Sequence, residues 1–300
     1  MFQKSLFTVA LLAAATSAIA QPASTLDKVK ESGTITMGVR DSSGALSYTL
    51  GDGKYTGYHV EICQRIIDNI EKQVGKKLTV KYQPVTSQNR IPLVQNGTVD
   101  LECGSTTNNL TRQKDVAFAD TTFVEEVRVA VKASSGINGI ADLNGKTVAT
   151  TTGTTSVQTL RKNERARGID FKEVFGKDHA DSFLLLSSGR ADAFVMDGSL
   201  LAGNIANSPN PAEFKIVGAP LSVEPIAIMF RKDDAGIKKA ADDTIVALAK
   251  SGELEKLYTK WFLNPIPPKG VKLNLPMSEN MKKVIASPND KPAEDYAAAK

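Results

Sequence analysis

The sequence predicts an α/β fold, because segments typical of strands and helices alternate along most of its 300 residues. Two further observations indicate more than one structural unit. The alternation restarts at residue 127 with "VRVAVKA", and the chain returns to extended segments around Pro220 and Pro225. Apolar residues make up 41% of the chain, which is enough to build the cores of one large or two medium domains.

The first twenty residues are typical of a cleaved secretory signal peptide. "MFQKSLFTVALLAAATSAIA" has one lysine, a short apolar stretch from Leu6 to Ala15, and small residues at Ala18 and Ala20. A membrane-spanning helix needs roughly 20 consecutive apolar residues, and this stretch is shorter. We therefore expect residues 1–20 to be removed and the protein to be exported to the periplasm, with no lipid anchor because no cysteine follows the cleavage site.

Patterns in the next part of the chain place polar segments at strand ends. Isoleucines at positions 62, 66, 67 and 70 mark one face of an amphipathic helix. The expected elements are a strand at 34–40, a turn-rich segment at 41–58, that helix at 59–75, a strand at 78–85, a short helix at 89–97 and a strand at 99–104. The polar run "ECGSTTNNLTRQ" (102–113) therefore follows a strand, where ligands bind in open α/β sheets.

The later part of the chain repeats the alternation and then becomes helical. Strand and helix patterns follow one another over 127–133, 141–163, 170–176, 179–190, 191–198 and 199–208. Residues 215–233 indicate two extended segments around Pro220 and Pro225. A helix over 235–262 is expected to close the folded part, and the proline-rich stretch 264–276 to lie extended on the surface.

The residue types exclude several common chemistries. The sequence has no GxSxG, GxGxxG, P-loop or HExxH motif. Only two histidines, His59 and His179, are present, and two cysteines lack CxxC spacing, so no metal and no cofactor are expected. A net charge of +4 with scattered basic residues does not indicate nucleic-acid binding. The groups that remain are hydroxyls, arginines and helix N-termini, which bind anions.

Two features indicate an anion site. In "TTTGTTS" (150–156) a strand ends, Gly153 permits a tight turn and a helix starts near Thr155, so helix N–H groups face the loop. The alternative is that Thr154 or Thr155 only caps the helix. Three arginines, whose planar fork suits carboxylates, lie in strand-end loops of one half of the chain: Arg40, Arg90 and Arg112.

The cysteines leave two alternatives open. Cys63 and Cys103 are an even pair in a chain expected to reach an oxidising compartment, which permits a disulfide. Two buried free thiols fit as well, because unpaired cysteine is among the most buried residue types.

Several motifs together resemble the periplasmic glutamate/aspartate-binding proteins of ABC importers, which are polar amino acid solute-binding proteins. The motifs are "TSQNRIPLVQNGTVDLECGSTTNNLTRQ" (86–113), "TTGTTS", "KDHADSF", "SGRADAFVMDG" and "WFLNPIPPK". This resemblance covers essentially all of the mature chain. It implies a two-lobed α/β periplasmic-binding-protein fold with two crossover strands and a ligand cleft. Lobe one would be residues 24–126 plus 221–300, with the C-terminal tail, and lobe two residues 127–220.

The resemblance also implies a ligand-binding role for nine residues. The side-chain carboxylate of the amino acid would contact Arg40, Ser87, Arg90 and His179. The α-carboxylate would contact Arg112, backbone N–H groups of the Thr107 loop and Thr155. The α-ammonium would contact Asp197, the Thr107 hydroxyl and the Ser105 carbonyl. Taken singly, Asp197 is more typical of a helix cap and His179 of a satisfied loop histidine.

Charge counting then favours acidic ligands. Three arginines against Asp197 give the expected site a charge of about +2 with His179 neutral, which suits L-glutamate or L-aspartate and repels a cationic ligand. If His179 gains a proton on binding, affinity should rise below about pH 6.5. The implied protein is a monomeric carrier, without enzymatic activity, that delivers its ligand to a membrane permease.

Two departures from the family pattern leave alternatives open. Ala45 and Leu46 stand where the family usually has a proline and a ligand-packing aromatic residue, with Tyr48 as a partial replacement. Gly198 follows Asp197 where relatives tend to have a second acidic residue. The alternatives are a binder of another polar amino acid, a sensor domain, or a cyclohexadienyl-dehydratase-like enzyme of the same fold with His179 as general acid.

Overall fold

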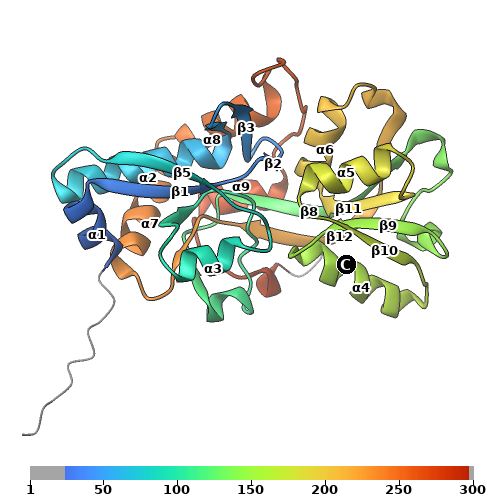
Figure 1. The fold of residues 1–300 in the computed structure, drawn as a ribbon, viewed down its shortest axis with the longest axis horizontal. Coiled ribbons are helices and arrows are strands. Elements are labelled where there is room, and N and C mark those ends of the chain that lie inside the picture. Colours follow the sequence, from blue (N-terminus) through green and yellow to red (C-terminus); the bar gives the residue numbers. More distant parts are fainter. Residues whose placement is uncertain (1–23, 297–300) are drawn as a thin grey trace, which may run out of the picture.

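The computed structural model describes residues 24–296, so the expected signal peptide at residues 1–20 lies outside the described part of the chain. Two mixed β-sheets lie side by side along the long axis of the molecule, each with its own helices (Figure 1). We call the part built on the first sheet the first lobe and the part built on the second sheet the second lobe. The predicted α/β class is confirmed.

The first sheet has five strands in the order β5-β1-β6-β13-β7. Strands β5, β1 and β6 are parallel, and β13 pairs antiparallel with β6 and β7. Its strands are β1 (Thr34–Val39), β5 (Thr79–Pro84), β6 (Leu101–Glu102), β7 (Val116–Phe118) and β13 (Met229–Arg231). The helices of this lobe are α1 (Thr25–Ser32), α2 (Tyr58–Val74), α3 (Arg90–Gln95), α7 (Ala235–Lys250), α8 (Glu253–Tyr258) and α9 (Glu279–Ala286). Sequence periodicity correctly predicted α2, whose isoleucines at 62, 66, 67 and 70 are fully buried.

The second sheet also has five strands, in the order β10-β9-β11-β8-β12. The strands β9, β10 and β11 are parallel, and β8 lies antiparallel between β11 and β12. The elements are β8 (Phe123–Lys132), β9 (Thr147–Thr151), α4 (Thr155–Arg167), β10 (Lys172–Gly176), α5 (His179–Ser187), β11 (Ala193–Asp197), α6 (Gly198–Asn207) and β12 (Phe214–Ile226). A parallel arrangement brings the carboxyl ends of β9, β10 and β11 to one edge.

The antiparallel strands β8 and β12 connect the two lobes. Their register runs from Phe123 opposite Ile226 to Lys132 opposite Phe214. At the first-lobe end, the N–H of Thr122 donates to the carbonyl of Ile226 at 3.0 Å. Residues 215–233 hold two strands, as expected, but the break lies after Ile226 and not at a proline. Strand β12 runs through Pro220 and Pro225 with a register shift between residues 217 and 222, and β13 follows it.

The turn-rich segment 41–58 contains more structure than the sequence indicated. It forms a small three-stranded antiparallel sheet of β2 (Ser42–Ser43), β3 (Ser47–Gly51) and β4 (Lys54–Thr56). The sequence pattern is weak here because these strands are short and largely exposed beyond Ser47.

The C-terminal part differs from the expectation of one closing helix. The predicted helix over 235–262 is interrupted at Gly252, which has a left-handed φ of 74°, and continues as α8 and a short π-helix at Thr259–Leu263. The folded part also extends beyond residue 262, because α9 buries Met281, Val284 and Ile285. The expectation that the folded part ends at residue 262 is therefore wrong.

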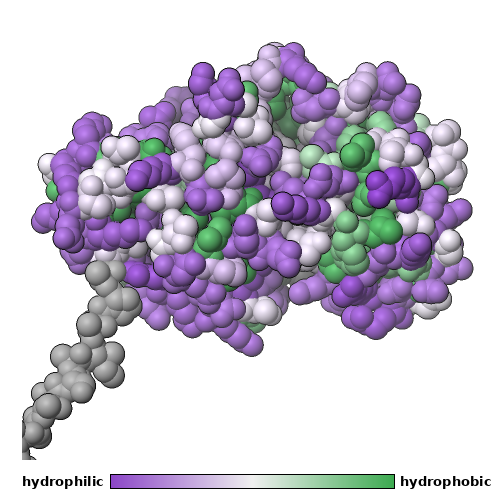
Figure 2. Space-filling model, viewed as in Figure 1, coloured by the Kyte–Doolittle hydropathy of each residue, from purple (hydrophilic) through white to green (hydrophobic). Residues whose placement is uncertain are grey.

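The molecular surface is polar over most of the face in Figure 2, with smaller hydrophobic areas over its right-hand part, where the second lobe lies. Across residues 24–296, no helix has the length and apolar character needed to cross a bilayer.

The open question about the cysteines is resolved by a disulfide between Cys63 in α2 and Cys103 after β6. Both side chains are fully buried. The bridge therefore attaches the end of β6 directly to the main amphipathic helix of the first lobe.

We predict that reducing this disulfide lowers the free energy of unfolding by about 4 kcal/mol, because closing a loop of this length restricts the unfolded chain. The sequence separation of the two cysteines is 40 residues. Urea unfolding of the oxidised and the reduced protein measures the difference, and Cys63→Ala/Cys103→Ala serves as a control that cannot re-form the bridge. Equal urea midpoints in the oxidised and reduced forms would contradict this prediction.

Candidate functional site

The nine residues expected to bind ligand come together between the lobes, at strand ends and helix starts. Arg40 follows β1, Thr155 and His179 begin α4 and α5, and Asp197 ends β11. Thr155 is half-buried. The other eight are at most 9% exposed: Arg40, Ser87, Arg90, Ser105, Thr107, Arg112, His179 and Asp197.

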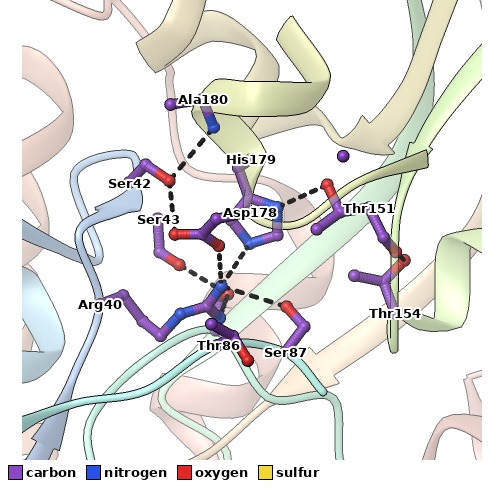
Figure 3. Close-up of polar contacts among 12 residues, drawn as sticks. Arg40, Ser42, Ser43, Thr86, Ser87, Thr151, Thr154, Asp178, His179 and Ala180 are labelled. Atoms are coloured by element: carbon purple, nitrogen blue, oxygen red, sulfur yellow. Dashed lines mark hydrogen bonds and ion pairs between the residues drawn. The ribbon is translucent and has the colours of Figure 1, made fainter. Parts of the chain in front are cut away.

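Arg40 lies at the centre of one cluster (Figure 3). Its Nη2 is within hydrogen-bond distance of Ser87 Oγ (3.1 Å), Asp178 Oδ1 (2.5 Å) and His179 Nε2 (3.1 Å). Its Nη1 lies 3.5 Å from Ser105 Oγ. Arg40 and Ser87 belong to the first lobe and Asp178 and His179 to the second, so this cluster spans both lobes.

Asp178 is the residue of this cluster that sequence reasoning missed. It precedes α5 and forms a capping box with Asp181. Its Oδ2 accepts a hydrogen bond from Ser42 Oγ at 2.9 Å. Burial alone would raise the pKa of Asp178, but the charge of Arg40 and the hydrogen bonds from Ser42 and Arg40 outweigh it and hold the pKa below its usual range. Its position directly before His179 in "KDHADSF" was the available signal.

His179 is neutral in this arrangement. A guanidinium can only donate, so Nε2 faces Arg40 as an acceptor and the ring proton lies on Nδ1, 3.1 Å from Thr151 Oγ1. Burial first, and then the charge of Arg40, lower the pKa of His179 to about 3. Burial therefore opposes protonation of His179 in the ligand-free protein, and the rise in affinity below about pH 6.5 stays a prediction that requires ligand to raise this pKa.

His59 has a structural role. Its Nδ1 lies 2.5 Å from the carbonyl of Gly104 and its Nε2 lies 2.9 Å from Thr122 Oγ1. Burial lowers the pKa of His59 to about 4.

We predict that neither histidine gains a proton between pH 8 and pH 5 in the folded, ligand-free protein. NMR titration of the imidazole C–H resonances measures this directly, since the chain has two histidines. Because both folded-state pKa values lie below the usual value of about 6.5, the unfolded chain binds more protons as the pH falls. Both histidines therefore decrease the free energy of unfolding as the pH falls from about 6.5 towards 4. A resonance that titrates near pH 6.5 would show that its histidine is not buried as described.

A second cluster joins Arg112, Thr107 and Thr155. Arg112 Nη1 donates to the carbonyl of Thr107 at 2.9 Å, and Nη2 donates to the carbonyl of Gly153 in the other lobe at 3.4 Å. Gly153 has a φ of 81°, and a Cβ there would lie 2.8 Å from the Cα of Gln88. A glycine at this position therefore allows the two lobes to approach closely.

The helix-cap alternative for "TTTGTTS" is not supported. Thr154 occupies the N-cap position of α4, but its side chain makes no cap hydrogen bond and donates instead to the carbonyl of Thr151 at 2.8 Å. Thr155 Oγ1 donates to Glu224 Oε2 at 2.6 Å. The first turn of α4 is thus free of side-chain capping by Thr154.

Arg90 and Asp197 have buried polar atoms that lack partners. Within residues 24–296, Arg90 Nε and Nη1 and Asp197 Oδ1 have no hydrogen-bond partner. Asp197 stands at the N-cap position of α6 without capping it through its side chain, so the helix-cap alternative fails here too. Such atoms cost free energy when buried, and a bound group that supplies the missing hydrogen bonds would remove this cost.

The electrostatics of Arg90 and Asp197 reflect their burial. Burial, and then the charges of Arg112 and Arg40, lower the pKa of Arg90 to about 9. Burial, and then Glu125 and Glu224, raise the pKa of Asp197 well above its usual range, while Arg90 and Arg112 oppose this shift. A bound cation beside Asp197 and a bound anion beside Arg90 would relieve both effects.

The charge count made from the sequence was incomplete. Besides Asp197, four carboxyl groups lie in or beside the site: Glu102, Glu125, Asp178 and Glu224. Glu125 and Glu224 face each other on β8 and β12. Burial raises the pKa of Glu125 to about 7. The three guanidinium groups are therefore balanced by more acidic groups than Asp197 alone, which sequence spacing could not reveal.

The residues at the first family departure, Ala45 and Leu46, do not form an aromatic platform. Ala45 and Leu46 are buried in the hydrophobic core. The Tyr48 hydroxyl donates to the carbonyl of Pro267 at 2.6 Å, and its ring packs edge-on against Trp261. The idea that Tyr48 replaces the missing aromatic residue is therefore wrong, because its side chain is engaged elsewhere.

The arrangement as a whole is suited to binding a small zwitterion with an additional anionic group. The three guanidinium groups lie on the first lobe, hydroxyls and His179 of the second lobe face them, and carboxylates gather near Asp197. Over residues 24–296, no group of three or more His, Cys, Asp or Glu side chains is placed to hold a metal ion.

Comparisons with known proteins agree with this geometry. The chain is 47% identical over 281 residues to the glutamate/aspartate import solute-binding protein of Escherichia coli (strain K12), covering 93% of each chain. It is 47% identical over 296 residues to the L-glutamate/L-aspartate-binding protein of Pseudomonas aeruginosa, covering 97% of this chain and 98% of that protein. These names support a binding protein over the dehydratase alternative.

Solved structures show the same two-lobed fold. A mutant of ArgBP from T. maritima superposes with a TM-score of 0.69 at 27% identity, over 79% of this chain and 98% of that one. The family model for bacterial extracellular solute-binding proteins, family 3, matches residues 35–264. The chain therefore belongs to the bacterial extracellular solute-binding proteins of family 3.

Proposed function

We propose that this protein binds L-glutamate or L-aspartate in the periplasm and delivers it to the membrane permease of an ABC importer. The observation that supports this most is that Arg90 has buried donors, and Asp197 a buried acceptor, without hydrogen-bond partners in the described part of the chain. An amino acid supplies the missing acceptor and the missing donor at once. The names of the relatives from Escherichia coli and Pseudomonas aeruginosa support the same ligands.

In this proposal each part of the ligand has its own partners. The side-chain carboxylate contacts the cluster of Arg40, Ser87, Arg90 and His179. The α-carboxylate contacts Arg112, backbone N–H groups of the Thr107 loop and the start of α4 at Thr155. The α-ammonium contacts Asp197, Thr107 and the carbonyl of Ser105.

The proposed mechanism is closure of the lobes around the ligand, with a monomer as the working unit. In this proposal one lobe comprises residues 24–126 and 221–300, and the other comprises residues 127–220. The chain then crosses between the lobes once in β8 and once in β12. Because Arg40 and Arg112 belong to one lobe and Thr155, His179 and Asp197 to the other, a ligand that contacts both favours the closed form.

We predict that calorimetric titration of ligand-stripped protein gives tight binding for L-glutamate and L-aspartate and no comparable binding for L-glutamine or L-lysine. Lysine would place its cation near Arg40 and Arg90, and glutamine would leave these arginines without a carboxylate. Tight binding of glutamine or lysine would contradict the proposed ligand class. Turnover of a prephenate-like substrate would contradict the carrier function.

We predict that Arg112→Ala weakens L-glutamate binding by roughly 2–5 kcal/mol, because a buried carboxylate loses its charged partner. The matched control is Arg161→Ala, since Arg161 lies on α4 with its side chain 48% exposed and pairs with Glu173. Calorimetry should give the control the affinity of the parent protein. Near-native affinity of Arg112→Ala would remove this residue from the binding site.

A further inference from the structure

Glu224 bonds through one carboxylate oxygen to hydroxyl groups of both lobes. Its Oε2 accepts hydrogen bonds from Thr107 Oγ1 at 2.7 Å and from Thr155 Oγ1 at 2.6 Å. Its Oε1 accepts a hydrogen bond from Ser222 Oγ at 2.8 Å. Glu224 is 4% exposed and lies on β12, so a buried carboxylate on a connecting strand orients hydroxyls on either side of the site.

These bonds determine what Thr107 can offer a ligand. A threonine hydroxyl has one proton to donate and two lone pairs to accept with. Once the proton of Thr107 points at Glu224, the oxygen presents only lone pairs to any other group. It then suits an ammonium, which donates, and disfavours a carboxylate, which accepts.

The hydroxyl of Thr155 is oriented in the same way. The two hydroxyl oxygens lie 3.3 Å apart, and both protons are directed at the same oxygen of Glu224. The Thr155 hydroxyl is thus unable to donate to the α-carboxylate of a ligand. Any contact of Thr155 with that carboxylate is left to its backbone N–H at the start of α4.

The surrounding charges reinforce this polarity. Glu125 on β8 lies directly opposite Glu224 on β12, and Asp197 lies within electrostatic reach of both. Three carboxyl groups thus lie near the Thr107 hydroxyl, where Arg112 contacts the Thr107 carbonyl, whereas one carboxylate, Asp178, lies at Arg40.

We infer that Glu224 is a positioning residue that turns the Thr107 hydroxyl into an acceptor for the α-ammonium group, so that the site requires an amine on its dicarboxylate ligand. This inference rests on the proposed function. In this inference Glu224 acts through its hydrogen bond with the Thr107 hydroxyl rather than through a contact of its own with the ligand.

The test compares Glu224→Gln with the parent protein using two ligands. L-Glutamate and glutarate share the same two carboxylates, but glutarate lacks the amine. We expect the Kd for L-glutamate to rise about tenfold or more, because a charge-assisted orientation is lost. The Kd for glutarate, measured by displacement of bound L-aspartate, should stay the same or fall. An unchanged urea midpoint would show that the variant is folded.

Glu126→Gln is the matched control. Glu126 lies next to Glu125 on β8, but its side chain is 40% exposed and pairs with Arg128. The same loss of charge at this position should leave both Kd values within about twofold.

A double-mutant cycle with Thr107→Val uses L-glutamate alone. If Glu224 acts through the Thr107 hydroxyl, the double variant should lose less affinity than the product of the two single losses. Multiplicative losses would overturn the inference, as would parallel weakening of L-glutamate and glutarate in Glu224→Gln, or an unchanged L-glutamate affinity. Failure of the parent protein to bind either acidic amino acid would instead overturn the proposed function itself.

Discussion

The burial of three guanidinium groups between two lobes is the constraint on which the site depends. A buried cation costs several kcal/mol unless a charged or hydrogen-bonding partner compensates it. Asp178 compensates Arg40 across the lobes, and the charges of Glu224 and Glu102 act favourably on Arg112. Arg90 is compensated least, because both its Nε and its Nη1 lack hydrogen-bond partners among the described residues, whereas Arg40 lacks one at Nε alone. The same requirement, that the buried guanidinium charges be compensated, therefore favours both contact between the lobes and the binding of an anion.

The two connecting strands take part in the chemistry of the site as well as joining the lobes. Glu125 and Glu224 face each other on β8 and β12, and like charges in that position are unfavourable. Hydroxyls offset the repulsion: the Ser199 hydroxyl donates to Glu125, and the hydroxyls of Ser222, Thr107 and Thr155 donate to Glu224. Any relative movement of the lobes must rearrange some of these bonds, so the strands and the site are coupled.

Local sequence signals predicted what is local in the structure. The strand ends that carry Arg40 and Asp197, and the helix start at Thr155, follow from periodicity and turn residues. Asp178 and Glu224 could not be found in this way, because they meet their partners across 138 and 117 residues. The pKa of His179 depends on the same tertiary contact. Helix α9 was missed because it has only eight residues, and the choice between a disulfide and two free thiols stayed open because the proximity of Cys63 and Cys103 is a property of the fold.

The disulfide lies one residue from the loop that begins at Gly104 and leads into Ser105 and Thr107. A chain with reduced thiols holds this loop against α2 through packing and the contact of His59 with the Gly104 carbonyl, without a covalent bond. For an exported carrier, covalent attachment is completed only after the chain leaves the reducing cytoplasm. Export, which we propose for this protein, would thus place the covalent attachment of the binding loop to α2 in the same compartment as the proposed ligand binding.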